Sequence, residues 1–379
     1  MRVLRWLLLA VLIVIAGFVT LRHFFGGGRR LEDRTAAPKL PASALQKVAD
    51  LDYPPGNVAV APNGRVFFTF HPDGRPPMKV AELVDGRAVP YPDEAYQHER
   101  KGAPFFQTVL SLRIDRQGRL WTLDHADYAI GQPRLLAFDL GTNRLVHQYD
   151  IPSDVAPFLS MMNDFQVDPS GEKIYIADAS PIRRRPALIV YDVASRTSRR
   201  VLADHPSVQA KDFLVQAPGR DMIFFGFYAL RVPVDSIALD RRGEWLYYAP
   251  VSDERMYRVR ASDLNNATFT PEVLGALVED YGPKTLSDGL TIDESDNIYI
   301  SDMEHSAVLT LSPDRKLTTL IKDDRLRWPD GFSFGPDGWV YVTSSSLQHV
   351  LFLPESHMRE HAPYQIFRFK PGASAPAGQ

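Results

Sequence analysis

One short pattern recurs six times along the chain and limits what it can fold into. Each copy has two alternating stretches around a tight turn, as in DFQVDPSGEKIYIAD at 164–178. There Phe165 and Val167 alternate with polar residues before the turn, and Ile174 and Ile176 do so after it. Such alternation predicts a β-hairpin. The turn positions of the six copies are Gly64, Gly118, Gly171, Gly243, Asp296 and Gly338.

The spacing of these turns predicts how the hairpins are organised. Successive turns are 54, 53, 72, 53 and 42 residues apart, which is room for a four-stranded unit each time. Further alternating stretches at 187–193 and 307–313 would supply outer strands, and no long helical period lies between the hairpins. We therefore predict an all-β fold, a six-bladed β-propeller over 46–372. In it, 364–370 completes the last blade and the longest interval holds an insertion near 205–225.

The N-terminus carries an apolar segment. Arg2 and Arg5 precede an uninterrupted apolar run of 16 residues at 6–21, and Phe24 and Phe25 could extend it toward the length of about 20 that spans a bilayer. No small-x-small cleavage site follows closely, which favours an uncleaved signal anchor over a removed signal peptide.

Four segments follow from these two patterns. They are a transmembrane or signal helix at 1–25, a flexible tether at 26–45, the propeller at 46–372 and a disordered tail at 373–379. We expect an exported protein, periplasmic or extracellular, that the N-terminal helix anchors in the inner membrane.

Composition excludes several functions. The chain has 43 basic and 46 acidic residues and a net charge of -3, so it shows no electrostatic footprint for nucleic acid. It has no cysteine, which excludes disulfides, thiolate metal sites and cysteine nucleophiles. No GxSxG elbow, phosphate loop or dinucleotide fingerprint is present.

The hairpin geometry also predicts a site. The first residue of strand one and the last of strand two lie at the same end, opposite the turn. Since the inner strands of a propeller line its channel, these ends should converge at one mouth. We expect an inner ring of ligand-binding residues there, with two orienting carboxylates behind it and two histidines as candidates for proton transfer. The ring is Asn163, Asp235, Asp288 and Asp330, the carboxylates are Asp178 and Asp302, and the histidines are His71 and His125.

The alternative for any single aspartate at such a corner is structural. Aspartate often caps backbone amides or forms an Asx turn there. Several carboxylates around one channel would repel one another, unless a cation or an amine ligand lies among them.

Four segments, 188–207, 235–264, 287–308 and 328–348, resemble bacterial members of the major royal jelly and yellow protein family, proteins related to dopachrome tautomerase. The resemblance implies a secreted or envelope-located six-bladed propeller with a small-molecule pocket at one end of its channel. From insect members it further implies binding of biogenic amines or dopachrome conversion, although function transfers less safely than fold.

A more distant resemblance is to the calcium-dependent gluconolactonase and senescence-marker propellers. Their site, a glutamate, an asparagine and an aspartate around one divalent ion, implies a metal on Asn163, Asp235 and Asp288. The glutamate is missing, because Gly56 and Asn57 stand where it is expected. We therefore expect no cofactor, with calcium as the alternative if Asp330 supplies the lost charge.

Three function classes stay open on this basis. The preferred one is an exported propeller that binds a small polar or aromatic molecule, best an amine, at the channel mouth, with tautomerase-like activity as an option. The second is a metal-dependent lactonase-type hydrolase, and the third is a non-catalytic envelope scaffold. In all three the expected partners are a small molecule and the membrane, and no nucleic acid.

One further motif is the stretch HMREH at 357–361, which matches the H-x-x-E-H pattern of inverted zinc peptidases. That chemistry needs both histidines on one helical face and a third ligand elsewhere, but Pro354 and Pro363 leave room for barely two turns. We interpret the stretch as a loop before the closing strand.

Overall fold

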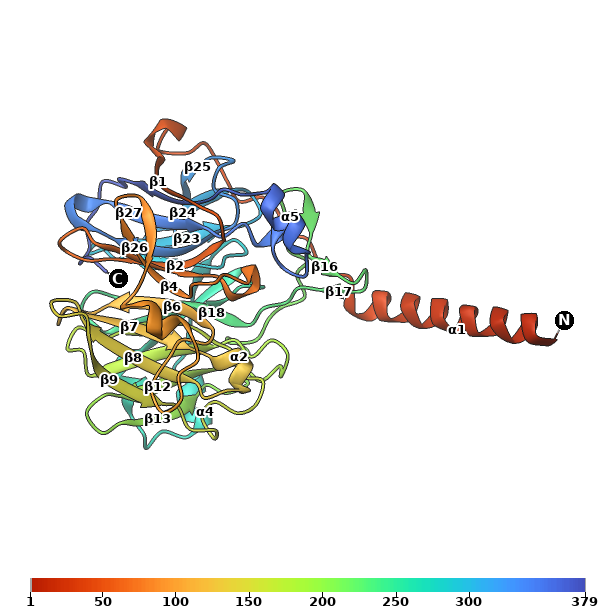
Figure 1. The fold of residues 1–379 in the computed structure, drawn as a ribbon, viewed down its shortest axis with the longest axis horizontal. Helices are drawn as coiled ribbons and strands as arrows, with labels where there is room; N and C mark the ends of the chain where they lie inside the picture. Colours follow the sequence, from red (N-terminus) through yellow and green to blue (C-terminus); the bar gives the residue numbers. More distant parts are fainter. Residues whose placement is uncertain (1, 379) are drawn as a thin grey trace.

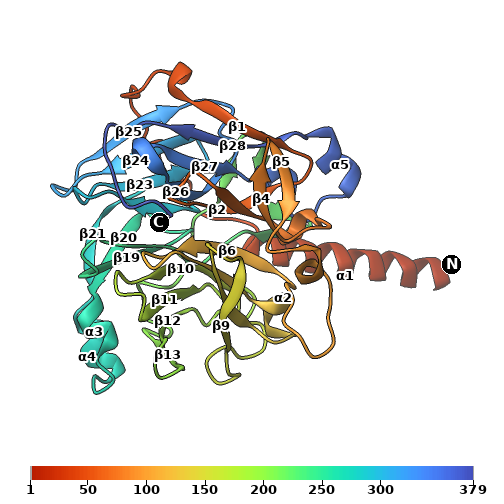
Figure 2. The ribbon, with the colours of Figure 1, turned by 60° about the vertical axis from the view of Figure 1, so that its left-hand side comes forward.

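Six four-stranded antiparallel sheets follow one another around a common axis in the computed structural model, which describes residues 2–378 (Figure 1). Figure 2 shows the blades from a second side, with the strands of each blade stacked outward from the centre. The arrangement confirms the predicted six-bladed β-propeller.

The first three blades run in order along the chain. Blade 1 consists of β2 (Pro55–Val60), β3 (Val66–Phe70), β4 (Val80–Val84) and β5 (Arg87–Pro90). Blade 2 consists of β6 (Val109–Ile114), β7 (Arg119–Asp124), β8 (Arg134–Asp139) and β9 (Arg144–Asp150). Blade 3 consists of β10 (Met162–Val167), β11 (Lys173–Asp178), β12 (Ala187–Asp192) and β13 (Thr197–Val201).

The other three blades complete the circle. Blade 4 consists of β18 (Val234–Leu239), β19 (Trp245–Pro250), β20 (Arg255–Arg260) and β21 (Glu279–Pro283). Blade 5 consists of β22 (Leu290–Ile292), β23 (Ile298–Asp302), β24 (Ala307–Leu311) and β25 (Leu317–Lys322). Blade 6 consists of β26 (Pro329–Phe334), β27 (Val340–Ser344), β28 (Tyr364–Phe369) and β1 (Gln46–Leu51).

Blade 6 joins the two ends of the propeller. The strand predicted at 364–370 is β28, its third strand, and β1 from the beginning of the propeller pairs with β28 as the fourth. This pairing satisfies backbone groups that would otherwise form an exposed edge.

Short elements lie between the strands. The long interval between blades 3 and 4 contains two small hairpins: β14 (Gln216–Ala217) with β15 (Arg220–Asp221), and β16 (Ile223–Phe224) with β17 (Tyr228–Ala229). The short helices are η1 (Ala42–Ala44), η2 (Pro72–Gly74), η3 (Glu94–Gln97), α2 (Ala126–Ala129), α3 (Ala261–Asn265), α4 (Pro271–Ala276), η4 (Pro336–Gly338), η5 (Leu347–His349) and α5 (Glu355–Glu360).

The core lies between neighbouring blades. Alternate strand residues pack there in apolar clusters, such as the one that joins blades 2 and 3 through Trp121, Phe165 and Ile176. Each inner strand therefore has one face fixed against the adjacent blade, and the start of the strand is held at the channel.

The segments outside the blades differ from the flexible tether and disordered tail that we expected. Arg34 of the 26–45 segment forms an ion pair with Glu254 at 2.6 Å and donates to the Lys284 carbonyl. In the tail, Gly378 N donates to the Phe334 carbonyl at 2.8 Å. Isolated apolar residues explain the difference, because Leu31, Leu40 and Ala375 pack against the blade clusters.

The N-terminal helix α1 (Arg2–Phe25) projects away from the blades (Figure 1). Its stretch Leu4–Phe25 has 22 residues, none of them buried, and is by length and composition able to cross a membrane. A signal sequence has the same length and composition, so the structure shows an N-terminal apolar helix that is either a membrane-spanning helix or a signal sequence.

Candidate functional site

One cavity opens at the end of the channel where the inner strands begin, and its volume is about 320 Å³. The positions eight residues before the six turns all line it, as do both predicted histidines. The structure thus brings together Asn163, Asp235, Asp288, Asp330, His71 and His125. Asp178 and Asp302 are not among the lining residues.

A β-bulge at the start of the inner strand positions the ring. The pairing register shifts between Met162 and Phe165 in β10 and between Val234 and Ser236 in β18, and it shifts at the same place in β2, β6 and β26. A bulge turns successive side chains away from strict alternation. Asn163 and Asp164 can therefore both face the cavity although they are neighbours in the sequence.

Glycine permits the close approach of adjacent inner strands. A Cβ at Gly289 would lie 1.8 Å from the Asp330 carbonyl oxygen, and one at Gly331 would lie 2.6 Å from the Asn57 Cα. The Asp-Gly pairs that begin blades 5 and 6 thus combine a ring carboxylate with a position that only glycine can fill.

The floor of the cavity contains a buried hydrogen-bond network. Asn57 Nδ2 donates to Asp164 Oδ1 at 2.8 Å, and Arg113 Nη1 donates to Asn57 Oδ1. A second guanidinium nitrogen of Arg113 lies 3.6 Å from Asp164 Oδ2. We did not predict these three residues as site residues. The sequence signal that could have found Arg113 is a charge between Leu112 and Ile114 in an apolar strand.

The ring carboxylates are buried together, and this changes their acidity. Burial raises the pKa of Asp164 to about 6, against the pull of Arg113. Burial, followed by the charge of Asp288, also raises the pKa of Asp235 and that of Asp330. Burial raises the pKa of Asp288 as well. Charging the whole ring without a ligand is therefore unfavourable.

Two ring carboxylates are oriented by single donors and one is left open. Trp328 Nε1 donates to Asp288 Oδ2 at 2.6 Å, and Ser345 Oγ donates to Asp330 Oδ2 at 2.8 Å. Asp235 Oδ1 is buried and has no hydrogen-bond partner within residues 2–378, while the Asn163 side chain acts on the same carboxyl group and lowers its pKa against the effect of burial. An unpaired buried carboxylate oxygen is costly, so it marks a place for a donor from a ligand.

The two histidines differ in burial, since His125 is buried and His71 is partly exposed. Burial, with the nearby His71, lowers the pKa of His125 to about 3, so its ring is a weak base at neutral pH. Its Nδ1 accepts from Tyr128 N at 2.9 Å and caps the turn that follows. The buried ring is therefore poorly suited to the proton transfer for which we considered it. His71 lines the cavity, and its Nδ1 accepts from Asp73 N at 3.3 Å.

The two carboxylates predicted behind the ring hold loops instead of ring residues. Asp178 accepts from Met161 N at 3.0 Å and from Arg200 Nη1 at 2.6 Å. Asp302 accepts from the backbone amides of Glu304 and His305, both at 3.0 Å. Their geometry fits the capping alternative.

The walls above the floor are mainly apolar. The β16–β17 hairpin region and the segment that follows blade 6's second strand both contribute to this surface. The apolar and aromatic residues that line the cavity are Pro72, Leu110, Tyr128, Met161, Pro181, Ile182, Phe224, Tyr228, Leu230, Val232, Val251, Trp328, Leu347, Leu351 and Phe352. The cavity thus combines an acidic floor with an apolar wall.

Solved structures share this fold. A luciferin-regenerating enzyme superposes with a TM-score of 0.56 at 13% identity over 88% of this chain and 97% of its own. The calcium-binding protein regucalcin from Agrobacterium tumefaciens gives 0.54 at 15% over 86% and 92%. A gluconolactonase from Xanthomonas campestris gives 0.55 at 12% over 91% and 97%. At these identities the likeness concerns the fold alone.

Curated relatives come from the honey bee, Apis mellifera. Major royal jelly protein 1 is 26% identical over 194 residues, 48% of this chain and 42% of that protein. Major royal jelly protein 6 is 26% identical over 181 residues, 45% and 39% of the two chains. The match therefore spans about two fifths of the length of these relatives. The sequence model of the major royal jelly proteins matches residues 107–356, and the chain belongs to this family.

Proposed function

We propose that the cavity binds a small organic amine whose ammonium group lies among the floor carboxylates. The observation that carries this proposal is the unpaired Asp235 Oδ1, buried beside three more carboxylates, with Arg113 as the guanidinium paired with the floor. A bound cation would offset the repulsion within the ring and donate to the open oxygen.

The donor set favours an ammonium group over calcium. Three carboxylates that share one calcium ion have oxygens within about 5 Å of one another. Within residues 2–378 no three ring carboxylates bring oxygens within 4.8 Å of one another. Asn57, at the place of the missing acid, is bonded to Asp164 and Arg113, and the guanidinium would repel a dication. These features support an ammonium group over a calcium ion of the lactonase type.

The walls suit a ligand with an apolar body. The Trp328 indole and the Phe224 and Tyr228 rings stand above the acidic floor. Aromatic faces stabilise a nearby cation by about 0.5–2 kcal/mol and also pack against carbon atoms. An aromatic amine would use both parts of the cavity.

His71 is the candidate for proton transfer if the bound molecule is converted. It lines the cavity, whereas burial lowers the pKa of His125 to about 3 and leaves that ring a weak base at neutral pH. A tautomerisation needs a base within hydrogen-bond reach of the substrate, and His71 is the imidazole that could meet this need.

The proposal includes a membrane anchor next to the cavity. In Figure 1, β16, β17 and α5 lie on the side of the propeller from which α1 leaves. The Phe18 ring of α1 contacts the Phe227 ring with centroids 6.0 Å apart, and Arg22 Nη1 donates to the Gly226 carbonyl at 2.6 Å. Phe18 lies about 10 Å along the helix from Phe25. A bilayer around α1 would therefore also take up the tip of this hairpin.

Exposed aromatic residues extend the same surface to the cavity. Phe225 and Phe352 are 65% and 67% exposed, with ring centroids 5.2 Å apart, and Phe352 also lines the cavity. Aromatic side chains are favoured at the membrane interface. The protein thus acts as an exported, anchored propeller whose cavity takes an amphipathic amine from the membrane surface.

Calorimetric titration of the full chain in detergent micelles tests the binding proposal. The probes are 2-phenylethylamine, its neutral analogue 2-phenylethanol and the anion phenylacetate. We expect the amine to bind at least about 10-fold more tightly than the alcohol, since one charge-assisted hydrogen bond contributes about 1.5–3 kcal/mol. Equal affinity for the amine and the alcohol would contradict a role for the carboxylate floor.

A further inference from the structure

Three histidines gather beside the cavity mouth, outside the carboxylate ring. The ligand nitrogens of His349, His357 and His361 all lie within 4.8 Å of one another. Among the described residues, no other group of three or more histidines, aspartates or glutamates comes this close. We propose that these three imidazoles bind a zinc ion.

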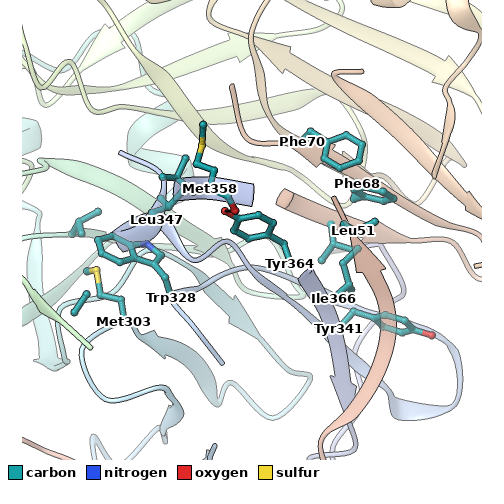
Figure 3. Close-up of a cluster of buried hydrophobic side chains, with 14 of the residues drawn as sticks. Leu51, Phe68, Phe70, Met303, Trp328, Tyr341, Leu347, Met358, Tyr364 and Ile366 are labelled. Carbon is teal, nitrogen blue, oxygen red and sulfur yellow. Dashed lines mark hydrogen bonds between the residues drawn. The ribbon is translucent and has the colours of Figure 1, made fainter. Parts of the chain in front are cut away.

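The local fold brings the histidines together. The stretch that we interpreted as a loop forms the helix α5 instead, with Pro354 at its N-cap and His361 at its C-cap. This helix is docked by buried Met358, whose carbonyl accepts from Tyr364 Oη at 3.0 Å (Figure 3). His357 and His361 thus stand one turn apart, the spacing with which a helix presents two zinc ligands.

The third ligand comes from a separate element. His349 ends η5, whose Leu347 packs in the same apolar cluster as Met358 (Figure 3). Its Nδ1 lies 3.3 Å from Nε2 of His357. Two ligands of a tetrahedral zinc ion with bonds of 2.0–2.1 Å are about 3.3–3.4 Å apart. This pair has the separation that zinc requires, whereas the His361 ring stacks on both rings, with centroids 3.8 and 4.2 Å away, and must turn to share the ion.

The hydrogen bonds select which nitrogens face the ion. His361 Nδ1 donates to the His357 carbonyl at 2.9 Å, which leaves the Nε2 lone pair of His361 for a metal. Donation of the second ring nitrogen to a backbone carbonyl is the usual way in which proteins orient a zinc-bound histidine.

The nitrogen ligands favour zinc over a hard cation, and neighbouring arginines hold the backbone of the site. Arg327 Nη1 donates to the His361 carbonyl at 2.9 Å, and Arg220 Nη1 donates to the Gln348 carbonyl at 2.8 Å. These two hydrogen bonds fix the backbone at His361 and next to His349. Nitrogen ligands suit zinc and copper, whereas calcium and magnesium need oxygen ligands.

A zinc ion at this position would stabilise one wall of the cavity. It would join η5 to α5, and between them run Leu351 and Phe352, which line the cavity together with Leu347. Zinc would hold this wall in place, so on the proposed function it should also tighten amine binding. The zinc site itself does not depend on that function.

Zinc titration of the full chain in detergent micelles, without a histidine tag and after chelator treatment, tests the proposal. We expect one zinc per chain at this site, not displaced by calcium or magnesium. His357→Ala should weaken binding by at least about 100-fold, because loss of even an outer-shell partner costs 10–100-fold. The control is His98→Ala, an exposed histidine that is paired with Glu94 one turn away on another short helix.

The zinc affinities of the variants distinguish the metal site from its link to amine binding. Equal zinc affinity in His357→Ala and His98→Ala would overturn the proposal. If His357→Ala does not fold, as judged by circular dichroism without metal, then His349→Gln replaces it, and unchanged affinity in that variant would overturn the proposal equally. Loss of zinc binding with unchanged amine binding would retain the metal site and remove only its link to the cavity.

Discussion

Trp328 Nε1 donates a hydrogen bond of 2.6 Å to Asp288 Oδ2, and this contact connects the beginnings of the inner strands of blades 5 and 6. Trp328 is a member of a buried apolar cluster, so packing of the core fixes the direction of the donor. The orientation of a ring carboxylate therefore depends directly on the hydrophobic core.

Trp328→Phe keeps an aromatic ring and removes this donor. A hydrogen bond to a charged group contributes about 1.5–3 kcal/mol, so the amine affinity at pH 7.5 should fall by about 10-fold or more. Calorimetry with 2-phenylethylamine measures the change. Unchanged affinity in a variant that melts normally would show that the indole does not orient Asp288.

The raised carboxylate pKa values predict how stability varies with pH. Because the folded-state pKa of Asp164 is about 6, above its ordinary value of 3.8, the folded chain holds an extra proton between these limits. The free energy of unfolding must then fall as the pH rises toward and through about 6. The decrease is at most about 1.4 kcal/mol per pH unit for one group. Asp235, Asp288 and Asp330 act in the same direction.

Ligand-free melting temperatures at pH 5.5 and 7.5, compared with those of Asp164→Asn, measure this effect. The difference between the two proteins isolates the carboxylate from other groups whose protonation changes on unfolding, such as His147, whose pKa burial lowers to about 4 in the folded chain. The variant should gain stability relative to wild type as pH rises. A constant difference across this range would contradict a protonated Asp164.

The fold was predictable because the hairpin repeat carries its own register. Counting back a fixed number of residues from each turn found the cavity positions Asn163, Asp235, Asp288 and Asp330 without any structure. That count assumes strict alternation. The bulges break it, and therefore it missed Asp164, which reaches the cavity beside Asn163.

Other differences come from contacts between distant segments. Shared strand ends placed Asp178 behind the ring, but a nearer amide at Met161 and the guanidinium of Arg200 bind it instead. The third zinc ligand, His349, lies eight residues before His357 and carries no spacing signal of its own. Such contacts depend on how loops pack, which neither alternation nor composition encodes.

The membrane-facing surface can be tested with single cysteines, since the chain has none. An environment-sensitive fluorophore at Phe225→Cys, with the full chain in liposomes, should be quenched by lipids that carry a quencher near the headgroup. The control is Val146→Cys, which is 53% exposed on an outer strand of blade 2. Equal quenching at the two sites would contradict insertion of the hairpin tip.

The central claim is that buried carboxylates at the channel mouth bind an ammonium group, and one comparison tests it most directly. Asp235→Asn removes the open floor carboxylate, whereas Asp73→Asn removes a carboxylate at the rim whose side chain is 50% exposed. In Asp235→Asn the affinity for 2-phenylethylamine should fall by about 30-fold or more, and the melting temperature should hold or rise because a neutral amide replaces a carboxyl group that is costly to bury in its ionised form. In Asp73→Asn the affinity for 2-phenylethylamine should change by less than about threefold, since solvent screens an exposed charge. If calorimetry finds that Asp235→Asn folds and keeps the wild-type affinity, the amine does not bind at the carboxylate floor.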